Sequence, residues 1–314
     1  MMANNEEKEC IENLLLVPCL ITVEAHEIFV GINAHKILSI VECTHLSSLP
    51  SSHFPFIGIH DNHQEAVPVM DLVSVFKHHA KNLIHELSET SLDEAIAPIP
   101  HIQAPHDKIV ICHLCNMTVG ILVQSTYRIE DIKSDQVIPI PKVFENHPNC
   151  MFNGLYHYRG NFLYLLDLEG ILDRLGLVQT VAMDTKQLPI NTNQFAGKTV
   201  LIAEDSKVFR HQMTEFLLKN GFKCVVAKDG QEGLEKFLES PQSVDVIISD
   251  IEMPRMNGIE MVRRIQEITS NIPVLFNSSI SNPALITEIE NRHGCFLVKF
   301  KPDEILTTLA KLMS

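Results

Sequence analysis

Apolar and polar positions follow two different patterns along the chain, and the change falls near residue 196. In the first half, short apolar runs of strand length are separated by polar turns. Cys19–Val23 and Ile28–Ile32 flank the polar turn Glu24–Glu27, which predicts a hairpin. The same pattern predicts further strands over Ile37–Val41, Phe54–Ile59 and Val67–Met70. We therefore expect a mostly β first half.

A weak internal repeat runs through this half. Val30-Gly31-Ile32 recurs as Val119-Gly120-Ile121, at an offset of 89 residues. In the same way, an apolar strand ends in Asp71-Leu72 and again in Asp167-Leu168. Residues 109–172 thus repeat the plan of residues 17–76, which predicts two similar β lobes in the form of small barrels.

The second half alternates between strand and helix patterns. Amphipathic helix patterns separate the apolar runs, and Ser206 stands where the first helix would have its N-cap. Five βα units predict a five-stranded, doubly wound parallel sheet in the flavodoxin-like strand order. The predicted strands are Thr199–Ala203, Cys224–Ala227, Val244–Ser249, Pro273–Asn277 and Phe296–Val298.

Candidate chemistry lies at the carboxyl ends of these strands. Glu204-Asp205 follow the first strand, Asp250 follows the third, and Lys299 follows the fifth. In the predicted strand order the first and third strands are neighbours, so their ends open into one crevice. Carboxylates that close repel each other unless a proton or a cation is bound. An oxygen-only cluster suits Mg²⁺, which we expect as the cofactor.

Composition and charge exclude several classes of partner. The apolar fraction of 45% and mean hydropathy of +0.09 indicate globular domains rather than disorder. Residues 1–196 carry 23 acidic and 11 basic residues, while residues 197–314 carry 16 and 14. The resulting net charge of −14 disfavours nucleic acid and anionic lipid. The acidic start and the short apolar stretch Leu14–Val23 predict neither a targeting signal nor membrane insertion, so we expect a cytoplasmic protein.

The first half resembles the chemotaxis coupling domain of the CheW family. That family's V-P-x-x-D-L run is matched by Val67, Pro68, Asp71 and Leu72, and the resemblance implies a coupling domain over residues 14–178. The family usually has a Leu-Arg-Gly turn before this run, whereas this chain has Asn62-His63-Gln64. Residues 179–196, which are polar and contain Pro189, are predicted to be a linker.

Residues 197–314 resemble the receiver domain of response regulators. The match rests on Glu204-Asp205, Asp250 with Met253-Pro254 and Gly258, Ser278, and Lys299. The resemblance implies that Asp250 accepts a phosphoryl group, assisted by Ser278 and Lys299. It also implies that Mg²⁺ is held by Glu204, Asp205, Asp250 and the main-chain carbonyl of Glu252.

The same resemblance implies a switch built from Ser278, or Ser279 one residue further on, and Phe296. Two departures from the family pattern bear on this switch. Phe296 has no hydroxyl group to hydrogen-bond when it moves. Phe300 follows Lys299 where the family usually has proline, and a cis bond without proline costs about 2.5–4 kcal/mol.

A coupling-like half followed by a receiver resembles the CheV-type chemotaxis coupling proteins. This implies an adaptor, not an enzyme, that links chemoreceptors to the histidine kinase CheA, with CheW as a further candidate partner, at membrane-associated receptor arrays. One alternative is a phosphate sink, in which the receiver drains CheA and the coupling half only localises it. A second alternative is a response regulator whose first half is an enzyme. Residues 1–196 show no nucleophile–base pair or phosphate-binding loop that would support it.

Overall fold

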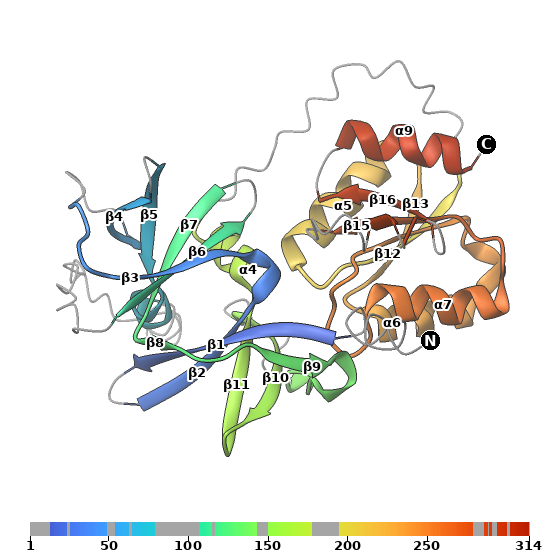
Figure 1. The fold of residues 1–314 in the computed structure, drawn as a ribbon. Helices are drawn as coiled ribbons and strands as arrows, with labels where there is room; N and C mark the ends of the chain where they lie inside the picture. Colours follow the sequence, from blue (N-terminus) through green and yellow to red (C-terminus); the bar gives the residue numbers. More distant parts are fainter. Residues whose placement is uncertain are drawn as a thin grey trace, which may run out of the picture. The chain divides into compact units, whose positions relative to one another are not determined.

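The computed structural model (Figure 1) has two parts, one mostly β and one α/β. It describes residues 13–23, 26–48, 54–62, 65–78, 107–114, 117–142, 150–177, 195–278, 286–287, 289–290, 294–299 and 302–313. Most of the predicted linker, together with His63, Gln64, Ser279 and Phe300, lies outside these residues. No helix within them is long and apolar enough to span a membrane.

The first part begins with the predicted hairpin. β1 (Asn13–Val23) pairs antiparallel with β2 (His26–Asn33), and Val23 faces His26 across the turn. The other predicted strands are present with shifted ends, and a helix over residues 72–78 follows β5. The remaining elements are β3 (Ile37–Glu42), β4 (Phe56–Asn62), β5 (Glu65–Asp71), β6 (Lys108–Leu114), β7 (Met117–Val123), β8 (Ser125–Thr126), β9 (Glu130–Lys133), β10 (Phe152–Tyr158), β11 (Asn161–Leu166) and α4 (Leu168–Arg174).

Two sheets confirm the prediction of two similar β units, but the repeats do not form one sheet each. One sheet has the order β10-β11-β2-β1-β8, with β9 also on β1, and the other has the order β3-β6-β7-β5-β4. Each therefore combines a hairpin from one repeat with strands of the other, through the parallel pairs β11–β2 and β5–β7. Strand pairing between the repeats thus adds to the hairpins β1–β2, β4–β5, β6–β7 and β10–β11, which form within them.

The repeated glycine explains part of this exchange. A Cβ atom at Gly31 would lie 3.2 Å from the side chain of Leu163 in β11. At the equivalent Gly120, a Cβ atom would lie 2.7 Å from Ile109 and 3.1 Å from Val69 of β5. Glycine thus lets a strand from the other repeat pack closely at both positions.

The second part confirms the predicted parallel sheet. All neighbouring strands run parallel in the order β13-β12-β14-β15-β16, which is the flavodoxin-like order. Its elements are β12 (Thr199–Ala203), α5 (Lys207–Lys219), β13 (Lys223–Ala227), α6 (Gly230–Glu239), β14 (Val246–Ser249), α7 (Gly258–Ile268), β15 (Val274–Ser278), β16 (Cys295–Val298) and α9 (Pro302–Leu312).

Two hydrophobic clusters cover the two faces of this sheet. Leu201 and Ile247 pack with residues of α6 and α7, whereas the alternate positions Val200 and Val246 pack with residues of α5 and α9. Strands buried on both faces are apolar throughout, which is why the sequence shows continuous apolar runs here. Phe195 lies in the range predicted as linker, yet it is 1% exposed and stacks on Phe222 within the α5 cluster.

Candidate phosphoryl-acceptor site

Three acidic residues meet at the carboxyl edge of the parallel sheet. Glu204 and Asp205 directly follow β12, and Asp250 directly follows the neighbouring strand β14. One carboxylate oxygen from each of the three lies within 4.8 Å of the others. Glu204 and Asp250 are buried, and Asp205 is partly exposed. The crevice that the strand order predicted therefore exists, and it brings these three residues together.

Lys299, just after β16, reaches into this cluster. Its Nζ donates to Asp250 Oδ2 at 2.6 Å and to Glu204 Oε1 at 2.8 Å. The side chain of Lys299 is only 8% exposed, and its ammonium also lies 4.9 Å from the ring centre of Phe209. The main-chain N–H of Lys299 donates to the carbonyl of Ser278 at 2.9 Å, which fixes the start of this segment against β15.

The charges of this cluster do not balance, because three carboxylates face one ammonium group. Burial, reinforced by the charges of Asp250 and Asp205, raises the pKa of Glu204 to about 8 against the opposing effect of Lys299. Burial alone lowers the pKa of Lys299, but attraction to Asp250, Glu204 and Asp205 outweighs it and holds that pKa well above its usual value. The site therefore retains a charged lysine and holds a proton on Glu204 near neutral pH.

Asp250 is held in place by hydrogen bonds to main-chain groups. Its N–H donates to the carbonyl of Ala203 at 2.8 Å, and its Oδ1 accepts from the N–H of Ile251 at 2.6 Å. A Cβ atom at Gly258 would lie 1.9 Å from the main-chain oxygen of Asp250, so only glycine fits at this position. The sequence motif that joins Asp250 to Gly258 thus reflects direct contact between the two residues.

The other predicted site residues lie close to this edge in sequence and topology. Ser278 is the last residue of β15 and is 1% exposed. Glu252 is half-buried, two residues after Asp250. Phe296 in β16 is 8% exposed, lies beside Phe276 of β15, and belongs to the hydrophobic cluster against α6 and α7. The roles of Ser278, Glu252 and Phe296 remain predictions.

Sequence reasoning missed two residues of the site. Arg210 on α5 donates from Nη1 to the carbonyls of Glu204 at 2.6 Å and Asp205 at 3.0 Å, which holds the acidic loop in place. Phe209 shields the ammonium of Lys299. A clue for Arg210 was available, because a helix that starts at Lys207 places its first turn directly after the acidic pair.

The residues present fit Mg²⁺. The cluster offers carboxylate oxygens without nitrogen or sulfur ligands, which is the donor set that Mg²⁺ prefers. Its excess negative charge is offset only in part by Lys299, so a divalent cation would complete the charge balance. The acidic cluster is typical of a magnesium site in a receiver domain.

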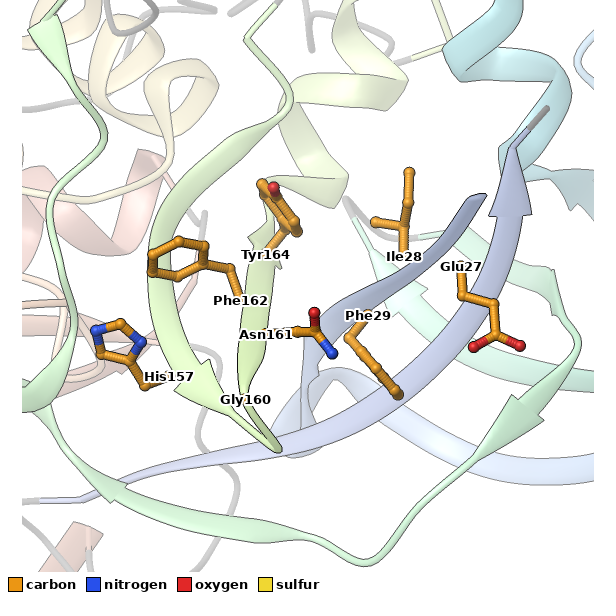
Figure 2. A pocket seen from close by; sticks show the side chains of 8 residues that line it. All are labelled: Glu27, Ile28, Phe29, His157, Gly160, Asn161, Phe162 and Tyr164. Carbon is orange, nitrogen blue, oxygen red and sulfur yellow. The ribbon is translucent and has the colours of Figure 1, made fainter. Parts of the chain in front are cut away.

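A separate open cavity of about 410 Å³ lies in the β part, against β2 and the β10–β11 hairpin (Figure 2). The rings of His157 and Phe162 lie 4.9 Å apart in its wall. Aromatic rings with one carboxylate suit contact with a partner better than catalysis, which needs an activated nucleophile or paired titratable groups. The lining residues are Glu27, Ile28, Phe29, His157, Gly160, Asn161, Phe162 and Tyr164.

Fold and site together define a response-regulator receiver joined to a β-rich part with two sheets. The family described as response regulator receiver domain matches residues 200–310, and the CheW-like domain family matches residues 19–176. The chain therefore belongs to the CheV family of chemotaxis proteins, which combine a CheW-like domain with a receiver.

Three proteins illustrate what the chain is similar to. The chain is 30% identical over 299 residues to chemotaxis protein CheV3 of Helicobacter pylori, an alignment that covers 90% of this chain and 88% of that protein. The receiver part is 32% identical over 119 residues to chemotaxis protein CheY of Thermotoga maritima, covering 37% of this chain and 98% of CheY. The scaffolding protein TtCheW from Thermoanaerobacter tengcongensis aligns with 51% of this chain and 93% of its own at 13% identity, with a TM-score of 0.38.

Proposed function

We propose that this protein is a chemotaxis adaptor that couples chemoreceptors to the histidine kinase CheA, and that phosphorylation of Asp250 modulates the coupling. The observation that carries the proposal is the convergence of Asp250, Lys299 and the Glu204–Asp205 pair in a chain that also has a CheW-like domain. The CheW-like domain supports CheA and chemoreceptors as partners, with CheW as a further candidate. It also supports a cytoplasmic location at membrane-associated receptor arrays.

Asp250 is the phosphoacceptor in this proposal. A carboxylate oxygen of Asp250 attacks the phosphorus atom of a phosphohistidine on the kinase. The new P–O bond forms as the P–N bond breaks, and the imidazole nitrogen keeps the electron pair of the broken bond. Lys299, at 2.6 Å from Asp250, then pairs with a phosphoryl oxygen. Positioning and charge stabilisation of this kind account for most of the catalysis of phosphoryl transfer.

The remaining residues would hold Mg²⁺ and pass the effect of phosphorylation to the rest of the receiver. Glu204, Asp205, Asp250 and the carbonyl of Glu252 would hold Mg²⁺, which when bound neutralises charge that develops on the phosphoryl oxygens. Ser278 donates a hydrogen bond to the phosphoryl group. Since Phe296 is packed in the core beside β15, a shift of Ser278 is coupled to repacking around that ring. The repacked surface then alters how the coupling domain engages receptor and kinase.

The first experiment follows labelled phosphate from a phosphorylated CheA-type kinase to this protein in the presence of Mg²⁺. We expect transfer to the wild type and to Asp245→Asn, and none to Asp250→Asn. Asp245 is a matched control because it directly precedes β14, whereas Asp250 directly follows that strand. Label on Asp250→Asn would refute the site assignment.

The phosphate-sink alternative is separated by a second measurement. Receptor arrays with CheA are assembled with either the wild type or Asp250→Asn, and kinase activity is recorded as attractant is added. A switch predicts that phosphorylation changes the receptor control of the kinase, so that the substitution alters it. Unchanged receptor control would favour the sink.

A further inference from the structure

An ion pair that the sequence did not predict joins two loops at the carboxyl edge of the receiver sheet. The guanidinium of Arg255, between β14 and α7, donates from Nε to Asp229 Oδ2 at 2.7 Å, and a second nitrogen donates to the same oxygen. Asp229, between β13 and α6, has a side chain that is only 3% exposed, and that of Arg255 is 27% exposed. Charge-assisted bonds to a buried carboxylate are among the stronger side-chain interactions.

The backbone of Arg255 shows that this position is constrained. Its φ angle is +66°, in the left-handed region that non-glycine residues rarely occupy. The neighbouring residues are constrained as well, because Gly230 donates its N–H to the carbonyl of Met256 at 3.0 Å, and a Cβ atom at Gly230 would lie 2.4 Å from that oxygen.

Arg255 lies in the segment that leads from Asp250 to α7. Gly258 at the far end of this segment donates its N–H to the carbonyl of Ile251 at 2.9 Å, and the Asn257 side chain caps α7 by accepting from the N–H of Glu260. Hydrogen bonds therefore join the two ends of this segment to each other and to α7. The contact from Asp229 and Gly230 holds its middle part against the start of α6.

We propose that Asp229 and Arg255 are positioning residues, which hold the loop over residues 251–257 in the conformation that binds Mg²⁺ beside Asp250. The loop carries Glu252, whose carbonyl is one of the proposed ligands. This inference rests on the proposed function of the site. It predicts that breaking the ion pair weakens cation binding without removing any ligand.

The test uses the whole two-domain chain with four substitutions and one double variant. Arg255→Gln removes the charge at nearly constant length, and Asp229→Asn removes it while keeping an acceptor for the N–H of Glu232, now at 3.0 Å. Arg264→Gln is the control, because it breaks an exposed ion pair with Glu260 on α7 away from the loop. Mg²⁺ affinity is measured by calorimetry, and amide exchange of residues 251–258 is measured without Mg²⁺.

We expect Arg255→Gln and Asp229→Asn each to weaken Mg²⁺ binding by about three- to tenfold and to speed exchange in the loop. The double variant should be no worse than either single one, because both remove the same interaction. Arg255→Lys, which restores the charge, should recover part of the affinity.

Three results would overturn the inference. These are unchanged Mg²⁺ affinity in both single variants, an equal loss in Arg264→Gln, or a lower unfolding midpoint of the receiver as the sole effect. If the wild type itself does not bind Mg²⁺, the proposed function fails instead. The exchange measurement then still decides whether the ion pair holds the loop, since unchanged exchange in the variants overturns that as well.

Discussion

Binding of Mg²⁺ to this protein should release close to one proton at pH 7. In the cation-free site, burial and two neighbouring carboxylates raise the pKa of Glu204 to about 8, so this residue is mostly protonated at neutral pH. A bound cation needs the ionised carboxylate, so that proton must leave. The perturbation is therefore a change of pH, with Glu204→Gln as the matched variant.

The magnitude follows from the pKa. With a value of about 8, the ionised fraction of Glu204 rises from about 3% at pH 6.5 to about 75% at pH 8.5. Apparent Mg²⁺ affinity should increase by the ratio of these fractions, about 25-fold, and change little above pH 9. Affinity rises with pH because the proton on Glu204 competes with the cation at every pH below the raised pKa of this residue.

Isothermal titration calorimetry in two buffers of different ionisation enthalpy measures both affinity and proton release. The wild type should release about 0.9 proton at pH 7, given a pKa of about 8. Glu204→Gln should bind Mg²⁺ more weakly, with little dependence on pH and little proton release. Constant wild-type affinity from pH 6.5 to 8.5, or equal proton release in the variant, would show that Glu204 does not hold the proton.

Three substitutions test how the receiver is built, each by urea unfolding followed by circular dichroism. Lys299→Met leaves the buried Asp250 carboxylate without its partner and should destabilise the receiver by about 3 kcal/mol at pH 8 without Mg²⁺; a stabilised variant would mean that the lysine is not needed for charge balance. Gly258→Ala places a Cβ atom 1.9 Å from the Asp250 carbonyl and should cost at least ~2 kcal/mol, so an unchanged midpoint would contradict the contact. Phe195→Ala removes a ring that is 1% exposed and should lower the free energy of unfolding by about 3 kcal/mol. An unchanged free energy of unfolding would mean that Phe195 is not part of the receiver core.

The local pattern of apolar and polar residues was sufficient to predict the fold of the receiver part. Its strands are buried on both faces, so they appear as apolar runs between amphipathic helices, and the βα alternation predicts a parallel, doubly wound sheet. Since parallel strands end at one edge, the positions of Glu204, Asp250 and Lys299 directly after strands were enough to predict that they meet. The predicted cluster is confirmed by geometry, while the roles of its members remain to be tested.

Which strands of the β part pair with each other could not be predicted from the local pattern, because the pairing is long-range. The repeat around Gly31 and Gly120 predicted two similar units, but a periodicity along one segment carries no information about which distant strand pairs with it. The contact of Arg255 with Asp229 depends in the same way on how two loops pack after the sheet has formed. The sequence by itself thus determined which acidic and basic residues meet at this edge of the sheet, because strand ends are local features. Only the tertiary structure decided that Arg255 pairs with Asp229, because these partners come from separate loops.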